Sequence, residues 1–281
     1  MIESKLIQQL KGLNSKELKG LKSFLQSPYF NNSKDITKLF EVIRKHAPNY
    51  DSPYLEKERV FKKVFPGKSF QDVKLRNLMS KVSRLVEKYL IQAFYEEHNF
   101  EKEKLLTKIY GNRNCYSLFE QLSNKLLKEI NARSVLHLSH FQDIHAISLS
   151  LYEHLQTNPK NQVHLIKNAY EAFEQYYISE RLRIAIGFKS RETQYQESHP
   201  VPIDSFEYLL SKTNLAHTLY KKALVLLDHP EEFNYLELKE FVLKHEDSLS
   251  NQEVLLVLRL SLNYNIIRMN DKEIFLSLIH I

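Results

Sequence analysis

Apolar residues along this chain recur at intervals of three and four positions, the spacing of one face of an α-helix. The clearest pattern lies within residues 70–97. Its stripe is predicted to face the interior of a helix bundle and contains Leu75, Leu78, Val82, Leu85 and Tyr89, widened by Met79, Val86, Leu90 and Ala93. Nothing in the sequence has the alternating pattern of consecutive strands. The periodicity therefore predicts an all-α fold.

The same periodicity, with prolines and capping residues as boundaries, predicts the other helices. They cover approximately residues 14–26, 34–46, 55–64, 101–109, 116–136, 141–155, 162–189, 206–227 with an interruption near Thr213, 232–244 and 251–269. Capping-box spacing is found at Asn14 with Glu17 and at Ser250 with Glu253. Ser69 with Asp72 and Ser139 are further predicted caps.

Short connectors between consecutive helices favour antiparallel neighbours, as in a bundle or an α-solenoid. We expect a basic helical bundle at residues 1–110, followed by stacked antiparallel helical hairpins at 111–275. No strict repeat of about 34 residues is found, so any tetratricopeptide-like array would be degenerate.

The composition supports the all-α prediction and argues against several kinds of functional site. The 281 residues include only 5 Gly, whereas average usage predicts about 20. Tight turns and phosphate-cradling glycine loops are therefore expected to be few. The single Cys115 excludes an internal disulfide and a multi-cysteine metal site. No signal-peptide core or membrane-length apolar run is found, so we expect a cytoplasmic protein without membrane association.

The net charge of +6 is unevenly distributed. Residues 1–110 carry 22 Lys and Arg against 13 Asp and Glu, while the remainder carries 18 against 21. Within residues 57–88 the numbers are 10 and 3, and four of these cations fall opposite the apolar stripe: Lys74, Lys81, Arg84 and Lys88. They are candidate partner-binding residues for an acidic protein or nucleic acid, although the protein's own second half or plain solvation would also account for them.

Three patterns suggest chemistry but have a simpler explanation. Gly67-Lys68-Ser69 resembles the end of a phosphate-binding loop, but Lys62 stands where the first glycine is needed. His137, His140 and Asp143 are spaced by threes, as metal ligands could be, yet the predicted cap at Ser139 favours a connector. Cys115 precedes a predicted helix, where a thiolate could be stabilised, but a structural cysteine is favoured. We expect neither a cofactor nor a bound metal.

The aromatic residues Tyr170, Phe173 and Tyr177 also have helical spacing. Core packing is the favoured interpretation of this stripe. A groove that holds a peptide segment, as in helical-repeat proteins, is the alternative.

Three strings resemble an uncharacterised family of bacterial all-helical proteins: LKSFLQSPYFN at 21–31, VFKKVFPGKSFQDVKLRNLMSKVSRLVEKYL at 60–90 and LNYNIIRMN at 262–270. The resemblance spans nearly all of residues 1–275, and PYFN and FPGK…KLRN are its most specific parts. Members of that family are longer and continue into tetratricopeptide-like helices. The resemblance implies a helical architecture and a chain corresponding to the first part of a longer protein. It implies no activity.

The last six residues, 276–281, read LSLIHI. This is the translation of a transposase mosaic end used in sequencing libraries, so we expect a non-native tail. A genuine apolar helix is the alternative. A truncated helical array would leave an apolar face uncovered, here around Val254, Leu255, Leu258 and Ile266. The fragment is therefore expected to self-associate or to be less stable than the complete chain.

Taken together, these features favour a non-catalytic helical scaffold for protein–protein interaction. The alternative is a nucleic-acid-associated helical protein that binds through the basic face of residues 57–88.

Overall fold

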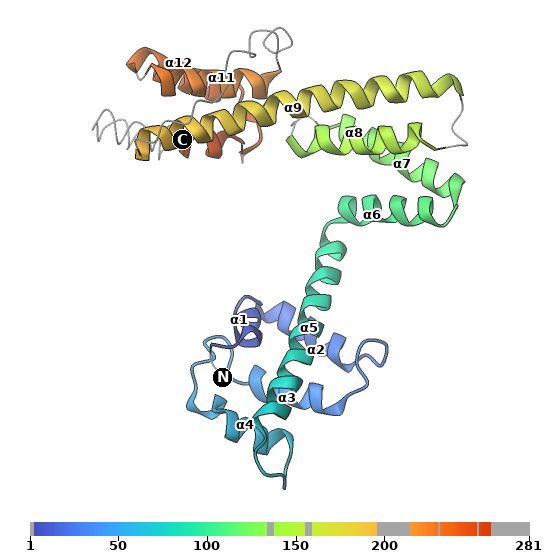
Figure 1. Cartoon of the computed structure of the whole chain (residues 1–281), viewed down its shortest axis with the longest axis vertical. Coiled ribbons are helices and arrows are strands. Elements are labelled where there is room, and N and C mark those ends of the chain that lie inside the picture. The colour runs from blue at the N-terminus through green and yellow to red at the C-terminus, as the bar shows by residue number, and fades with distance from the viewer. Residues whose placement is uncertain are drawn as a thin grey trace. The chain divides into compact units, whose positions relative to one another are not determined.

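The computed structural model describes residues 3–133, 138–154, 159–195, 214–229, 231–251 and 253–259. Within these ranges every regular secondary-structure element is a helix and no β-strand forms, which confirms the all-α prediction (Figure 1). The chain divides into two compact units, Met1–Lys102 and Glu103–Ile281. Their boundary lies inside helix α6 (Asn99–Asn112), whereas the sequence placed it at residue 110. Among the described helices, none combines the length and apolarity needed to cross a membrane.

The N-terminal unit is a bundle around one long helix, α5. Its elements are α1 (Lys5–Lys11), α2 (Ser15–Gln26), α3 (Lys34–Arg44), the 3₁₀ turn η1 (Pro53–Leu55), α4 (Lys57–Val64) and α5 (Asp72–Glu97). The shorter helices α1 to α4 all pack against α5. One continuous core results, to which every one of these elements contributes apolar side chains.

The start of α2 confirms the predicted capping box. The Asn14 Oδ1 atom accepts hydrogen bonds from the backbone N–H groups of Lys16 and Glu17 at 2.9 and 3.0 Å, and the Glu17 carboxylate accepts one from the Asn14 N–H at 2.7 Å. Leu13 and Leu18, on either side of the cap, are both buried. Two orphan donors of the helix start are thus satisfied, and the entry of the chain into α2 is fixed.

α2 and α5 approach closely at Gly20. A Cβ atom at this position would lie 2.3 Å from the Tyr89 hydroxyl oxygen and 3.1 Å from the ring carbon that bears it. Tyr89 packs against the core and meets the Phe24 ring edge-on at 5.7 Å. The contact between two helices, and not the backbone conformation of the residue, therefore favours glycine here.

We expect Gly20→Ala to lower the free energy of unfolding by about 1 kcal/mol in urea denaturation. Overpacking costs ~1–3 kcal/mol, and the better helix propensity of alanine returns at most ~1 kcal/mol. In a Tyr89→Phe background, Gly20→Ala should lower the free energy of unfolding by much less than it does in the wild type, since the nearest atom, the hydroxyl oxygen, has been removed. An equal loss in both backgrounds would contradict the steric explanation.

The C-terminal unit contains α7 (Tyr116–Asn131), α8 (Leu138–Tyr152), α9 (Pro159–Tyr195), α11 (Leu215–Asp228), α12 (Glu232–Lys244) and the 3₁₀ turn η2 (Glu246–Ser248). Each described helix from α7 onward packs on the next described one, from α7 to α8, α8 to α9, α9 to α11 and α11 to α12. A second core forms between the later part of α9, α11, α12 and residues 249–258. Of the predicted helix at 251–269, the described residues 253–259 are helical.

One predicted cap of this unit is wrong, and a second forms only in part. α8 begins at Leu138, so Ser139 lies within the helix and does not cap it. At the second predicted capping box, the Ser250 Oγ atom accepts from the Glu253 N–H at 3.2 Å. The Glu253 carboxylate, however, accepts from the backbone N–H of Leu138 at 3.2 Å instead of completing the local box. It therefore caps a helix that lies 115 residues away in the sequence.

The apolar face predicted near the C-terminus is mostly covered. Leu258 is buried and Val254 packs against the second core, so only Leu255 of this set is exposed among the described residues. Ile266, residues 206–213 and the tail 276–281 lie outside the described residues.

Candidate functional site: a basic groove along α5

The four cations predicted on α5 are presented by a helix whose other side is buried. Leu75, Leu78, Met79, Val82, Leu85 and Val86 lie in the core. The opposite positions must therefore face outward, as the period of the helix requires. The predicted stripe is buried only over this first part of α5, because Leu90 is exposed and Tyr89 is partly exposed.

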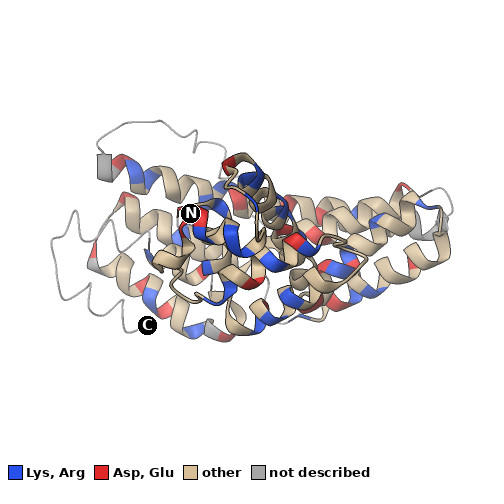
Figure 2. Cartoon of the chain, turned by 90° about the horizontal axis from the view of Figure 1, so that it is seen from below, with Lys and Arg blue, Asp and Glu red and all other residues tan. Residues whose placement is uncertain are grey.

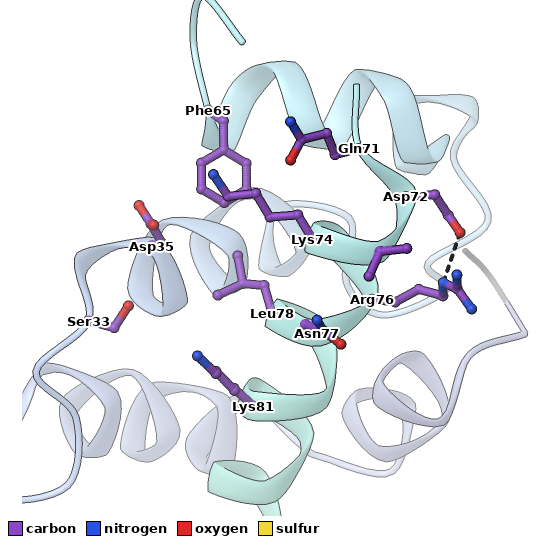
Figure 3. Close-up of a pocket in the computed structure, with 11 residues that line it drawn as sticks. Ser33, Asp35, Phe65, Gln71, Asp72, Lys74, Arg76, Asn77, Leu78 and Lys81 are labelled. Carbon is purple, nitrogen blue, oxygen red and sulfur yellow. Dashed lines mark ion pairs between the residues drawn. The ribbon is translucent and has the colours of Figure 1, made fainter. Parts of the chain in front are cut away.

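A depression of about 860 Å³ lies between the first turns of α5 and the start of α3 (Figure 3). Phe65, Lys74, Leu78 and Lys81 line it from the α4–α5 connector and from α5, and Ser33 and Asp35 line it from the start of α3. The Lys74 ammonium nitrogen lies 4.2 Å from the centre of the Phe65 ring, within range of a cation–π interaction. The depression thus has an apolar floor and a cationic rim.

A second depression, of about 520 Å³, adjoins the first because Ser33 and Lys81 line both. It continues along α5 past Arg84 and Lys88 and is closed on the other side by the α2–α3 loop. Together the two depressions form what we call the basic groove. All four candidate cations, Lys74, Lys81, Arg84 and Lys88, line it.

Asn31 holds the loop wall of the basic groove in place. Its Nδ2 atom donates to the carbonyl oxygen of Leu25 at 2.8 Å, and its Oδ1 atom accepts from the Ser33 N–H at 2.9 Å. The neighbouring Phe30 ring stacks on Phe24 with 4.0 Å between ring centroids. The wall is therefore fixed by both polar and aromatic contacts, which reduces the ordering cost of binding.

Carboxylates are distributed unequally around the basic groove. Asp72 forms ion pairs with Lys57 and Arg76, each at 2.8 Å. The hydrogen bond from Lys57 and the charges of Lys57 and Arg76 hold the pKa of Asp72 below its usual value. Within the part of the chain that the structure describes, by contrast, none of Lys74, Lys81, Arg84 and Lys88 forms an ion pair.

Acidic and basic residues are otherwise interspersed over the helices (Figure 2). A high number of cations therefore does not by itself distinguish the basic groove. Its distinguishing feature is that four cations without ion-pair partners line one continuous depression, which makes it a focus of positive potential.

The Gly67-Lys68-Ser69 string is a helix connector. Gly67 has φ +76°, a left-handed conformation that favours glycine, and Lys68 lies 5.9 Å from the centre of the Phe65 ring. The predicted cap at Ser69 and Asp72 is wrong: α5 begins at Asp72, after Gln71, and no side chain caps it. This segment therefore connects two helices and is not a phosphate cradle, and none of its three residues lines the basic groove.

The suspected metal ligands have other partners. His140 is buried on α8, with its Nε2 atom 2.9 Å from the Arg133 guanidinium, and Asp143 pairs with Lys104 at 2.9 Å. The expectation that His140 lies in a connector is wrong, because α8 begins before it. His137 lies outside the described residues. In the described ranges, no three His, Cys, Asp or Glu side chains are placed to hold a metal ion.

Cys115 occupies the N-cap position of α7, as the sequence predicted. Its Sγ atom contacts the Arg113 carbonyl oxygen at 3.7 Å. The rings of Tyr116 and Phe119 pack against His154, at 4.6 and 4.8 Å between centroids. The contacts around Cys115 are therefore those of a packed helix start.

The aromatic stripe on α9 does not belong to the core. Tyr170, Phe173 and Tyr177 are 64%, 48% and 42% exposed, so the favoured interpretation of core packing is wrong. Their exposure could not be read from the sequence, since α9 carries a second stripe with the same period, and it is this second stripe that is buried.

Comparison of the chain with protein-family models, curated proteins and solved structures finds no significant match.

Proposed function

We propose that the N-terminal unit docks an acidic segment of a partner protein in the basic groove, and that the chain acts as a non-catalytic scaffold. The observation that carries this proposal is the set of four cations without ion-pair partners that line one continuous depression. Charged rims around an apolar floor are a common arrangement at protein interfaces, where burial supplies affinity and charge supplies selectivity.

The composition of the groove favours a peptide over nucleic acid. Phe65 and Leu78 give it an apolar floor that suits an aliphatic or aromatic side chain. Asp35 stands among the lining residues and would repel a continuous phosphate backbone. Asp72 is a second carboxylate in the lining, although its charge is balanced by Lys57 and Arg76. An acidic peptide can place its carboxylates at Lys74, Lys81, Arg84 and Lys88 and avoid the two aspartates.

The connectors that border the basic groove are also longer than that of a DNA-binding helix-turn-helix. That motif joins its helices through three or four residues. Seven residues separate α2 from α3, twelve separate α3 from α4 and seven separate α4 from α5. α1 and α2 are joined by three residues, 12–14, but none of these lines the basic groove. Duplex DNA is therefore the competing ligand that an experiment should include, not the favoured one.

For the C-terminal unit we propose a solenoid-like stack of helical hairpins that presents further interaction surface. The packing of each described helix on the next one supports this arrangement, since nearest-neighbour packing is typical of helical arrays.

Reversal of the four groove charges (Lys74→Glu, Lys81→Glu, Arg84→Glu and Lys88→Glu together) should weaken binding of a labelled Glu- and Leu-rich 12-residue peptide at least tenfold. Each exposed charge pair contributes ~0.2–1 kcal/mol, and four act together here. Fluorescence anisotropy at low and physiological salt measures the dissociation constant.

A matched control reverses four exposed lysines that do not line the groove: Lys11, Lys16, Lys19 and Lys45. This variant has the same net charge and should bind the peptide within about twofold of the wild type. If both variants lost the same affinity for the peptide, the net charge of the protein, and not the basic groove, would account for binding. Random duplex DNA that binds more tightly than the peptide, with a steep salt dependence, would favour the nucleic-acid alternative.

Asp72→Asn should have the opposite effect and strengthen peptide binding by about two- to fivefold, since it releases Lys57 and Arg76 from their shared carboxylate. The same anisotropy titration measures it. Glu56→Gln, which releases Arg59 away from the groove, serves as the control and should leave affinity unchanged. Weaker binding by Asp72→Asn would show that this carboxylate organises the groove instead of competing with the ligand.

A further inference from the structure

The long helix α9 has two apolar faces, of which one is buried. Leu165, Ala169, Ala172, Ile178, Leu182 and Ile186 are buried on the side where α8 and α11 pack. A second set of large apolar side chains is exposed, each by at least 41%. We call this set the α9 seam; it consists of Val163, Ile166, Tyr170, Phe173, Tyr177, Ile184 and Phe188.

The α9 seam has the spacing of a helix–helix contact. Its members are separated by three or four residues up to Tyr177, then by seven and four. With about 100° of rotation per residue, all seven fall within an arc of about 80°. This is a narrow stripe like the a and d positions of a coiled coil, whereas isolated exposed apolar residues scatter over a surface.

Neighbouring groups hold the central rings of the seam in place. The His145 ring of α8 lies 5.2 Å from the Phe173 ring and makes a 2.9 Å hydrogen-bond contact with the carbonyl oxygen of Ala169. Phe173 and Tyr177 are stacked with 6.2 Å between centroids, and Arg181 donates to the Tyr177 hydroxyl at 3.0 Å. A partner would therefore meet side chains that are already ordered, which lowers the entropic cost of association.

We infer that the α9 seam pairs with the same seam of a second copy of this chain. The accessible area supports a second copy as the occupant. With roughly 200 Å² for each large apolar side chain, the exposed fractions leave on the order of 700 Å² uncovered per copy. Complete coverage of the seam in both copies would bury on the order of 1,400 Å², within the range of stable protein interfaces, about 1,200–2,000 Å².

The order of residues along the seam also suits pairing about a two-fold axis, which requires a self-complementary surface. The midpoint of the seam falls between Phe173 and Tyr177, so an antiparallel pair places these rings against each other at the axis. Ile166 of one copy then comes opposite Ile184 of the other. Two polar residues, Glu180 and Arg181, occupy the interval between Tyr177 and Ile184. Glu180 comes opposite Tyr170, whose hydroxyl can hydrogen-bond to it.

The test is the mass of the whole chain in solution. Sedimentation equilibrium between about 1 and 100 µM should give roughly twice the 33.4 kDa of one chain. Phe173→Glu combined with Tyr177→Glu brings four like charges to the axis, two from each copy, and should raise the dimer dissociation constant at least 100-fold. Circular dichroism should show unchanged helix content, because both side chains are exposed in the single chain.

A matched control places the same two changes on α12, as Phe233→Glu and Leu236→Glu, where the side chains are 65% and 46% exposed but outside the seam. This variant should stay dimeric. In a Cys115→Ser background, Tyr177→Cys should be cross-linked between copies by a short bismaleimide, and Leu236→Cys should not. A wild-type mass of one chain at every concentration, or equal dissociation of the control, would overturn the inference. So would a monomer whose seam binds an amphipathic helical peptide.

Discussion

Replacement of Phe61 by alanine is expected to lower the free energy of unfolding of the N-terminal unit by about 3–5 kcal/mol. The Phe61 side chain is fully buried, and its ring contacts those of Phe65 and Phe70 at centroid distances of 4.9 and 5.5 Å. Truncation leaves a cavity that these rings cannot close without moving. Urea denaturation followed by circular dichroism measures the loss.

The same change should weaken peptide binding, since Phe65 forms the floor of the basic groove and rests on Phe61. Two variants provide controls. Phe61→Leu keeps most of the volume and should cost less than about 1.5 kcal/mol. Phe94→Ala removes an exposed ring at the far end of α5 and should stay within about 0.5 kcal/mol of the wild type. If Phe61→Ala matched Phe94→Ala, the N-terminal core would be packed differently from the structure.

Glu253→Ala should destabilise the C-terminal unit by about 1.5–3 kcal/mol, the typical range for losing a hydrogen bond to a buried charged group. The Glu253 side chain is buried and accepts from the Leu138 N–H, so its loss leaves the start of α8 without this acceptor. Hydrogen exchange read by mass spectrometry should show lost protection at the first turn of α8.

The charge of Glu253 also acts on the buried Tyr220 hydroxyl. Burial raises the pKa of the Tyr220 hydroxyl, and the negative charge of Glu253 raises it further, so the hydroxyl stays protonated at neutral pH. Glu253→Gln retains an oxygen acceptor and should cost less than the alanine variant. If exchange increased at Ser250 but not in α8, the carboxylate would act as the local capping box that the sequence suggests.

Helix positions followed from local pattern to within a few residues in most cases. The predicted helix at 232–244 coincides with α12, and the capping box at Asn14 formed as expected. α1 was missed because its seven residues carry only Leu6, Ile7 and Leu10 as buried positions, too few to establish a period. The burial predicted for Leu90 did not occur, because the shorter helices pack over only the first part of α5.

Only part of the basic groove could be predicted from the sequence. Helical period was enough to place Lys74, Lys81, Arg84 and Lys88 opposite the apolar stripe of α5. The start of α3, which completes the basic groove with Ser33 and Asp35, could not be foreseen. Nor could the pairing of Asp72 with Lys57, fifteen residues earlier in the chain.

The sequence by itself determined the fold class and most helix boundaries, since propensity, capping and periodicity depend on residues within a few positions of each other. Only the tertiary structure decided which of the two apolar stripes of α9 is buried and which cations lack a carboxylate. It also directed the Glu253 side chain to the start of α8. These outcomes depend on contacts between helices far apart in the chain, where burial and charge pairing are set by which surfaces meet.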